Sequence, residues 1–277
     1  MKNNDPLVDK KVYMQMPNPC EPRYDHVPSA AWPTGDETLD TLFNGQLAIL
    51  QSRRGYRFSL DALLLAHFAA DKGTEKVADL GTGNGVIPMI LTHRNPAVFV
   101  WGLEVQEALT SRARRNLQLN SLDKRVRIVQ GDVRAIHRMV APESFDAVLC
   151  NPPYRKPSSG RVSPNAEKKI ARHEVMGTLQ EFLAAGRYLL TFKGRMSLVY
   201  PAVRCIDLLH AMRNAGLEPK RLRMVHSFPD TEASLVLVEG IKGGKSGIKI
   251  SSPLIVYRRE KKYSSEVQAM LDGSRVG

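Results

Sequence analysis

The fold of this 277-residue chain is decided by the stretch Asp79-Leu80-Gly81-Thr82-Gly83-Asn84-Gly85. The apolar residues 77–80 are typical of a short buried strand, and residues 86–92 are typical of the start of a helix. Glycines between a strand and a helix let the backbone approach a ligand without a Cβ in the way. The stretch therefore predicts a ligand-binding loop at the end of a sheet strand.

Strand-like and helix-like segments alternate after this loop. Strands are predicted at 98–104, 126–130, 145–150 and 194–200, and helices at 107–119, 179–190 and 203–215. Residues 221–226 and 233–239 are two further strands with no helix between them, which indicates a hairpin. Because parallel strands need crossover connections, we predict an α/β, Rossmann-like sheet of seven strands. It should be mostly parallel, with one antiparallel edge strand and helices on both faces.

The ends of the chain differ from this alternating region. Residues 1–35 contain six prolines and little periodicity, so we expect a flexible leader. A single domain is expected at 36–260, followed by a C-terminal tail at 261–277. Within the domain, residues 36–72 are expected to form a hairpin, with 45–51 paired to 55–58, and a buried helix at 61–70.

Composition limits the class of protein. The net charge of +12 favours a polyanion such as nucleic acid, although a basic surface can also serve solubility alone. The cysteines Cys20, Cys150 and Cys205 are far apart and lack metal-binding spacing, so neither a disulfide framework nor a metal site is expected. No apolar run resembles a membrane span or a signal peptide, which predicts a cytoplasmic protein.

Three carboxylates follow three successive strands: Asp79, Glu104 and Asp132. A dinucleotide fingerprint would need glycine at Val86, and Asp79 would repel a pyrophosphate but attract the ammonium of a methionine moiety. The ligand predicted is therefore S-adenosylmethionine rather than NAD. Glu104 could accept from the ribose hydroxyls and Asp132 from the adenine amino group. The alternative is that the acids cap helices and the glycines only turn the chain. The predicted cofactor-binding residues are Asp79, Gly81, Thr82, Gly83, Asn84, Gly85, Glu104, Val105, Asp132, Val133 and Asn151.

The motif Asn151-Pro152-Pro153-Tyr154 follows the predicted strand at 145–150. The Asn151 side-chain carbonyl and the Pro152 backbone carbonyl can accept the two protons of an aromatic amino group, whose lone pair must be localised before it can attack a methyl group. Proline fixes φ and so stiffens this loop. Tyr154 offers a ring on which a flipped base can stack. We predict these four residues to be catalytic, the alternative being a proline-rich turn.

A basic segment follows Tyr154 and contains glycine and serine. It could bind RNA phosphates, or it could be a solvated surface loop. The residues predicted to bind RNA are Arg155, Lys156, Arg161, Lys168, Lys169 and Arg172.

The set formed by 79–85, Glu104, Asp132 and 151–154 resembles class I amino-methyltransferases, which act on N6 of adenine, N2 of guanine or the amide of glutamine. Segments at 42–62 and 154–174 resemble the bacterial tRNA(Val) adenine-37 N6-methyltransferase group. That resemblance implies that Phe58 and Asp61 lie near the methionine part of the cofactor, although both also suit ordinary core and cap positions.

The sequence thus predicts a methyltransferase that uses S-adenosylmethionine to methylate N6 of adenine in RNA. The resemblance implies an anticodon-loop adenosine of tRNA as the acceptor. We expect no metal, no membrane partner and a monomer. The alternatives are a protein glutamine N5-methyltransferase of the release-factor type, an rRNA guanine-N2 or adenine-N6 methyltransferase, and a non-enzymatic RNA-binding module.

Overall fold

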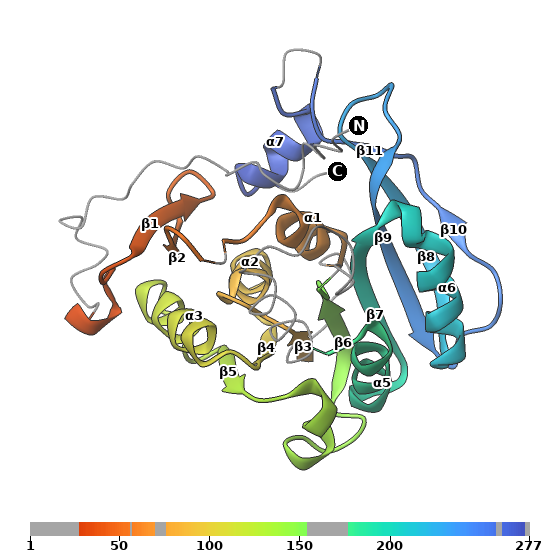
Figure 1. Cartoon of the computed structure of the whole chain (residues 1–277), viewed down its shortest axis with the longest axis horizontal. Coiled ribbons are helices and arrows are strands. Elements are labelled where there is room, and N and C mark those ends of the chain that lie inside the picture. Colours follow the sequence, from red (N-terminus) through yellow and green to blue (C-terminus); the bar gives the residue numbers. More distant parts are fainter. Residues whose placement is uncertain (1–27, 56, 70–75, 154–176, 259–261, 275–277) are drawn as a thin grey trace, which may run out of the picture.

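The computed structural model describes residues 28–55, 57–69, 76–153, 177–258 and 262–274, and is built around one large mixed sheet (Figure 1). The strands lie in the order β10-β8-β9-β7-β6-β3-β4-β5, and β11 also pairs with β8. Their bounds are β3 Lys76–Leu80, β4 Phe99–Glu104, β5 Val126–Gln130, β6 Phe145–Cys150, β7 Leu190–Pro201, β8 Leu217–His226, β9 Ala233–Lys242, β10 Lys249–Ile250 and β11 Leu254–Ile255.

The predicted seven-stranded, mostly parallel sheet is confirmed by the long strands β3 to β9. Strands β3 to β7 pair in parallel, whereas β9 runs antiparallel to both β7 and β8. The antiparallel strand therefore lies one position inside the edge. The two-residue strands β10 and β11 then extend the sheet beyond β8.

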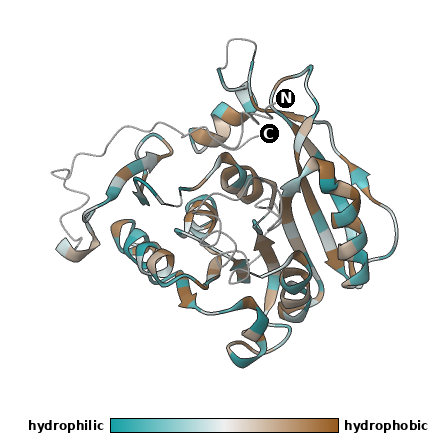
Figure 2. Ribbon diagram, in the orientation of Figure 1, coloured by the Kyte–Doolittle hydropathy of each residue, from teal (hydrophilic) through white to brown (hydrophobic). Residues whose placement is uncertain are grey.

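Helices cover both faces of the sheet, as predicted. Val77 and Ala78 belong to two different hydrophobic cores, because successive side chains of a strand point to opposite faces. Figure 2 shows the apolar residues of the strands between these helical layers. The first core lies under α1 Leu60–Ala69, α2 Val86–Arg94, α3 Glu107–Leu119 and α7 Ser265–Leu271. The second lies under η3 Val133–Arg138, α5 Leu179–Leu189 and α6 Cys205–Asn214, and the short helix η4 Ala202–Arg204 precedes α6.

The N-terminal hairpin forms, but with a different partner strand. β2 (Leu47–Ser52) pairs antiparallel with β1 (Glu37–Leu42), so the predicted pairing of 45–51 with 55–58 is wrong. Phe43, Asn44 and Gly45 all have positive φ, which closes a tight turn before β2 rather than after it. The predicted helix at 61–70 is confirmed as α1.

The expected division of the chain stays a prediction. Most of the expected leader, residues 1–27, lies outside the described residues, and Ser29–Ala31 forms the short helix η2. In the expected tail, α7 packs Val267 and Met270 into the first core. None of the helices within the described ranges combines the length and apolar content that a bilayer span needs.

Candidate functional site

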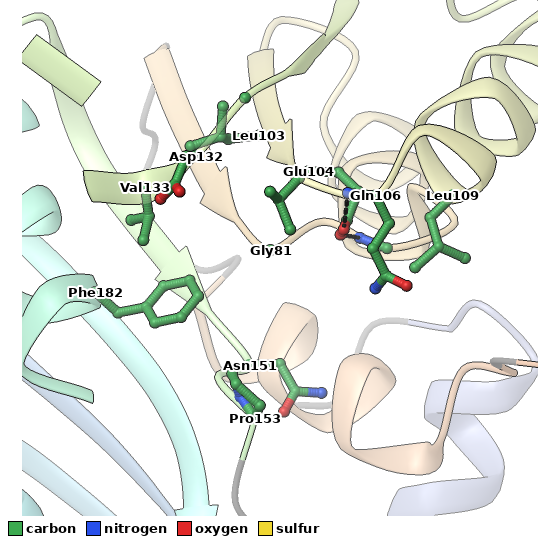
Figure 3. A pocket seen from close by; sticks show the side chains of 13 residues that line it. Gly81, Leu103, Glu104, Gln106, Leu109, Asp132, Val133, Asn151, Pro153 and Phe182 are labelled. Atoms are coloured by element: carbon green, nitrogen blue, oxygen red, sulfur yellow. Dashed lines mark hydrogen bonds between the residues drawn. The ribbon is translucent and has the colours of Figure 1, made fainter. Parts of the chain in front are cut away.

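The carboxyl ends of β3, β4, β5 and β6 meet at one cleft (Figure 3). This end of a parallel sheet is where ligands bind in open α/β folds. The residues that line the cleft are Gly81, Gly83, Leu103, Glu104, Val105, Gln106, Leu109, Gly131, Asp132, Val133, Asn151, Pro153 and Phe182.

The glycine-rich loop is held against the end of β4. The backbone N–H groups of Gly81 and Thr82 donate to the Leu103 carbonyl over 2.8 and 2.9 Å. The N–H of Gly83 donates to Glu104 Oε2 over 2.9 Å. Gly81 and Gly83 have φ of 76° and 58°, values that L side chains rarely adopt. The positive φ values explain why glycine occupies both positions. Because glycine has no side chain, the backbone of the loop also stays open to a ligand.

Asp79 is a buried carboxylate behind the loop. Its side chain is fully buried, and neither oxygen meets a hydrogen-bond partner within the described ranges. Burial raises its pKa to about 7; Thr82 lowers the pKa in part, and the charge of Glu104 raises it further. Asp79 is not among the residues that line the cleft. The site nevertheless carries an uncompensated acidic group, which fits a ligand with a positively charged amine.

Glu104 lines the cleft with both carboxylate oxygens held in place. Oε1 accepts from the N–H of Gln106 over 2.9 Å, and Oε2 accepts from Gly83, as the dashed lines in Figure 3 show. Burial raises its pKa, whereas the backbone hydrogen bonds lower it. Each carboxylate oxygen can accept a second bond, so Glu104 is oriented to bind vicinal hydroxyls.

Asp132 lies on the other side of the cleft as the N-cap of η3. Its Oδ1 accepts from the N–H of Arg134 over 2.8 Å, and its Oδ2 lies 2.5 Å from Arg134 Nη2. The side-chain hydrogen bond from Arg134 is the main reason that the pKa of Asp132 is lowered. Asp132 is thus an ionised, prepositioned acceptor whose Arg134 partner the sequence did not predict.

Asn151 and Pro153 come directly after β6 and line the same cleft, whereas Pro152 between them is buried. Figure 3 shows the two lining side chains across the cleft from Glu104. The sheet therefore brings Asn151 and Pro153 of the predicted catalytic motif together with two of the three predicted carboxylates. The motif residue Tyr154 lies outside the described residues, as do the six predicted RNA-binding residues Arg155, Lys156, Arg161, Lys168, Lys169 and Arg172.

Five predicted cofactor-binding residues other than Asp79 do not line the cleft: Phe58, Asp61, Thr82, Asn84 and Gly85. Phe58 is buried, with its backbone N–H bound to Gln51 Oε1 over 3.0 Å, and Gly85 is the N-cap of α2. Their predicted roles remain untested by this geometry. No group of three or more His, Cys, Asp or Glu residues in the described part of the chain is placed to hold a metal ion.

Phe182 is the main lining residue that the sequence did not reveal. It is buried in α5, and its ring lies over Gly81, where an added Cβ would be 3.6 Å away. Thr178 and Glu181 form a capping box that marks the start of α5. That motif predicts the helix, but it does not show that the next residue faces a cleft built by other strands.

Residues 60–212 match the family model described as methyltransferase small domain. A Porphyromonas gingivalis protein named tRNA1(Val) (adenine(37)-N6)-methyltransferase is 28% identical over 200 residues, which cover 70% of this chain and 78% of that protein. A Tolumonas auensis protein of the same name is 25% identical over 228 residues, covering 82% and 93%.

Solved structures share the fold. An Agrobacterium tumefaciens protein described as a predicted O-methyltransferase has a TM-score of 0.63 at 23% identity, covering 78% of this chain and 96% of its own. An M. jannaschii protein solved in complex with AdoMet has a TM-score of 0.50 at 15% identity, covering 76% and 87%. At these identities the likeness supports the class I methyltransferase fold alone.

Proposed function

The chain belongs to the methyltransferase small domain family, and we propose that it methylates the N6 amino group of an adenine in tRNA. It is a methyltransferase that uses S-adenosylmethionine, whose sulfonium supplies an electrophilic methyl group. The observation that carries the proposal is the position of Asn151, which follows β6 and opens onto the cleft that Glu104 and Asp132 line.

Cofactor binding is assigned to the carboxylate side of the cleft. Glu104 would accept from the ribose hydroxyls, since its oxygens are already oriented by Gly83 and Gln106. Asp132 would accept from the adenine amino group. Phe182 would pack against the bound ligand, because its ring lies beside Gly81 in the glycine-rich loop. The buried carboxylate of Asp79 would attract the ammonium from behind the loop.

Asn151 and Pro152 would orient the acceptor nitrogen. The lone pair of an exocyclic adenine amine is delocalised into the ring, so the amine is a poor nucleophile. Acceptance of its two protons by Asn151 Oδ1 and the Pro152 carbonyl would direct the lone pair toward the methyl group. No general base is needed before transfer, because the proton leaves only after the new N–C bond forms. Orientation and fixed dipoles then supply the rate enhancement.

Two observations support tRNA as the methyl acceptor. The net charge of +12 favours a polyanionic substrate. Relatives from several bacteria are named as methyltransferases of adenine 37 in tRNA1(Val).

The deciding experiment compares methyl transfer from labelled S-adenosylmethionine to total tRNA and to a purified release factor. We expect label in tRNA, recovered as N6-methyladenosine after nuclease digestion, and its loss from the tRNA of cells that lack the protein. Binding of tRNA should also weaken steeply with salt, because phosphate contacts release counterions. Label on the release factor alone would assign the activity to a glutamine amide instead.

A further inference from the structure

A second cavity is lined by residues of α1, α7 and the outer strands β8 and β11. The helix α7 lies next to α1, as Figure 1 shows, and β11 pairs with β8. It encloses about 640 Å³. None of its lining residues lines the cleft at Gly81, so the two sites are separate. Part of its wall is apolar and includes Phe68 and Met270. The rest is polar and contains three arginines, one glutamate, three serines and His67.

His67 presents a buried donor to this cavity. Arg94 Nη1 lies 2.9 Å from His67 Nδ1, and a guanidinium can only donate, so Nδ1 accepts and the ring proton is on Nε2. Burial lowers the pKa of His67 to about 3, and the charge of Arg94 lowers it further, against a smaller opposite contribution from the Met270 backbone. His67 is therefore neutral at pH 7. Within the described ranges this buried Nε2–H meets no acceptor with full hydrogen-bond geometry, and the hydrogen bond with the Met270 backbone makes the smallest of the three contributions to the pKa of His67.

Arg221 presents a second buried donor. Its guanidinium stacks on the Phe68 ring, 3.9 Å from the centroid, while Nη2 donates to the Phe68 carbonyl and lies 3.5 Å from Glu239 Oε2. These contacts fix the plane of the guanidinium. Its Nε is buried and has no hydrogen-bond partner among the residues that the structure describes. An unpaired, rigidly held guanidinium N–H is an unusual state for a buried group.

The cavity carries an excess of positive charge. Among the described residues that line it, the charged side chains are those of Arg94, Arg221, Arg223 and Glu266. Arg223 is neutralised by Glu266 through a bidentate ion pair with distances of 2.5 and 2.8 Å. Arg221 shares Glu239 with Arg195, which lies 3.7 Å from the same carboxylate oxygen. The unpaired donors therefore lie in a locally cationic field that favours an anion.

We propose that this cavity binds a small phosphate ester, whose phosphate oxygens accept from His67 Nε2 and Arg221 Nε. Phosphate suits these donors because it offers several charged acceptor oxygens in different directions. The cavity is larger than a bare ion needs, and the Phe68 and Met270 side of its wall would contact the organic group. A small ester fits better than an RNA backbone, because His67 is only 5% exposed and a phosphate within a polynucleotide would be too bulky to reach it.

The test is isothermal titration calorimetry of the full chain with ribose 5-phosphate at constant ionic strength. Saturating S-adenosylhomocysteine keeps the cofactor cleft filled. We expect a single site for ribose 5-phosphate, with inorganic phosphate as a weaker competitor. Arg221→Gln should weaken binding at least about tenfold, because a charge-assisted hydrogen bond is lost. His67→Phe, which keeps a ring and removes the donor, should also weaken it.

The matched control is Arg213→Gln, which removes the same charge from an exposed residue outside both cavities. It should leave ribose 5-phosphate affinity within about twofold of the wild type. Retained S-adenosylhomocysteine affinity shows that each variant is folded. Absence of heat with ribose 5-phosphate up to about 10 mM would overturn the proposal. So would equal losses in Arg213→Gln and Arg221→Gln, or an Arg221→Gln defect confined to tRNA binding.

Discussion

Asn116 Nδ2 donates to the backbone carbonyl of Asn84 over 2.9 Å, so a fully buried amide on α3 holds the glycine-rich loop. Oδ1 of the same side chain accepts from the N–H of Leu50 in β2 over 2.6 Å. One side chain therefore joins the cofactor loop, a helix and the N-terminal hairpin. The hairpin is thus part of the scaffold of the site, although it contributes no residue to the cleft lining.

Asn116→Ala should lower the free energy of unfolding by about 2–4 kcal/mol, because the Leu50 N–H and the Asn84 carbonyl lose buried partners. Urea denaturation measures this change. Gln118→Ala on the same helix is the matched control, since Gln118 is exposed. Equal midpoints for the two variants would show that Asn116 does not hold the loop.

Asp79 makes both stability and cofactor affinity depend on pH. Its pKa is about 7 in the folded protein without ligand and near 3.8 when exposed, so between these values only the folded chain holds the proton. The stability that this protonation contributes is therefore present at low pH and lost as pH rises through about 7. A bound ammonium favours the carboxylate instead. Affinity for S-adenosylhomocysteine should rise by up to about tenfold per pH unit from about 5.5 to 7 and then level off.

Calorimetry across that pH range checks the Asp79 prediction. Asp79→Asn should bind more weakly at pH 7.5 and with little pH dependence, while its ligand-free form should be more stable than the wild type at that pH. The variant also separates Asp79 from Glu104, whose pKa is raised in the same site. A wild-type affinity that does not change with pH would exclude Asp79 as the partner of the ammonium.

Phe182 is predicted to contribute binding energy rather than chemistry. Phe182→Leu keeps a large apolar side chain in the second core but removes part of the ring beside Gly81. The KM for S-adenosylmethionine should rise about fivefold with kcat retained, since roughly 1 kcal/mol of uniform binding is lost. Phe192→Leu is the control, because Phe192 is 68% exposed and outside the cleft. The same KM in both variants would remove Phe182 from the cofactor site.

Local sequence patterns were enough to predict the central elements. The predicted strands at 126–130 and 145–150 coincide with β5 and β6, and the predicted helix at 107–119 coincides with α3. Such elements are bounded by turns and have a clear apolar period. The hairpin partner was wrong because β1, Glu37–Leu42, includes polar residues that are buried through tertiary contacts, such as the 2.9 Å ion pair of Glu37 with Arg112 and the ion pair of Asp40 with Arg57.

The sequence allowed prediction only of those site residues that directly follow a strand. Glu104, Asp132 and Asn151 meet because parallel strands end at one edge, a property that the order of segments already implies. Whether a side chain opens onto the cleft depends on packing, which explains why Asp79 is buried behind the loop. It also explains why Phe182, brought in by a helix from the second core, carried no signal in the sequence.

Asn151→Ala should separate binding from chemistry. The change removes an acceptor that orients the amino group, so kcat should fall about 10²–10³-fold, the usual effect of removing one fixed electrostatic contact. Affinity for S-adenosylhomocysteine should stay within about threefold, because Glu104 and Asp132 keep their positions. Single-turnover methyl transfer to tRNA measures the chemical step. Asn214→Ala, at an exposed asparagine in α6, should leave both quantities unchanged. Near-normal turnover by Asn151→Ala would show that Asn151 does not orient the amine, and the proposed mechanism would then be wrong.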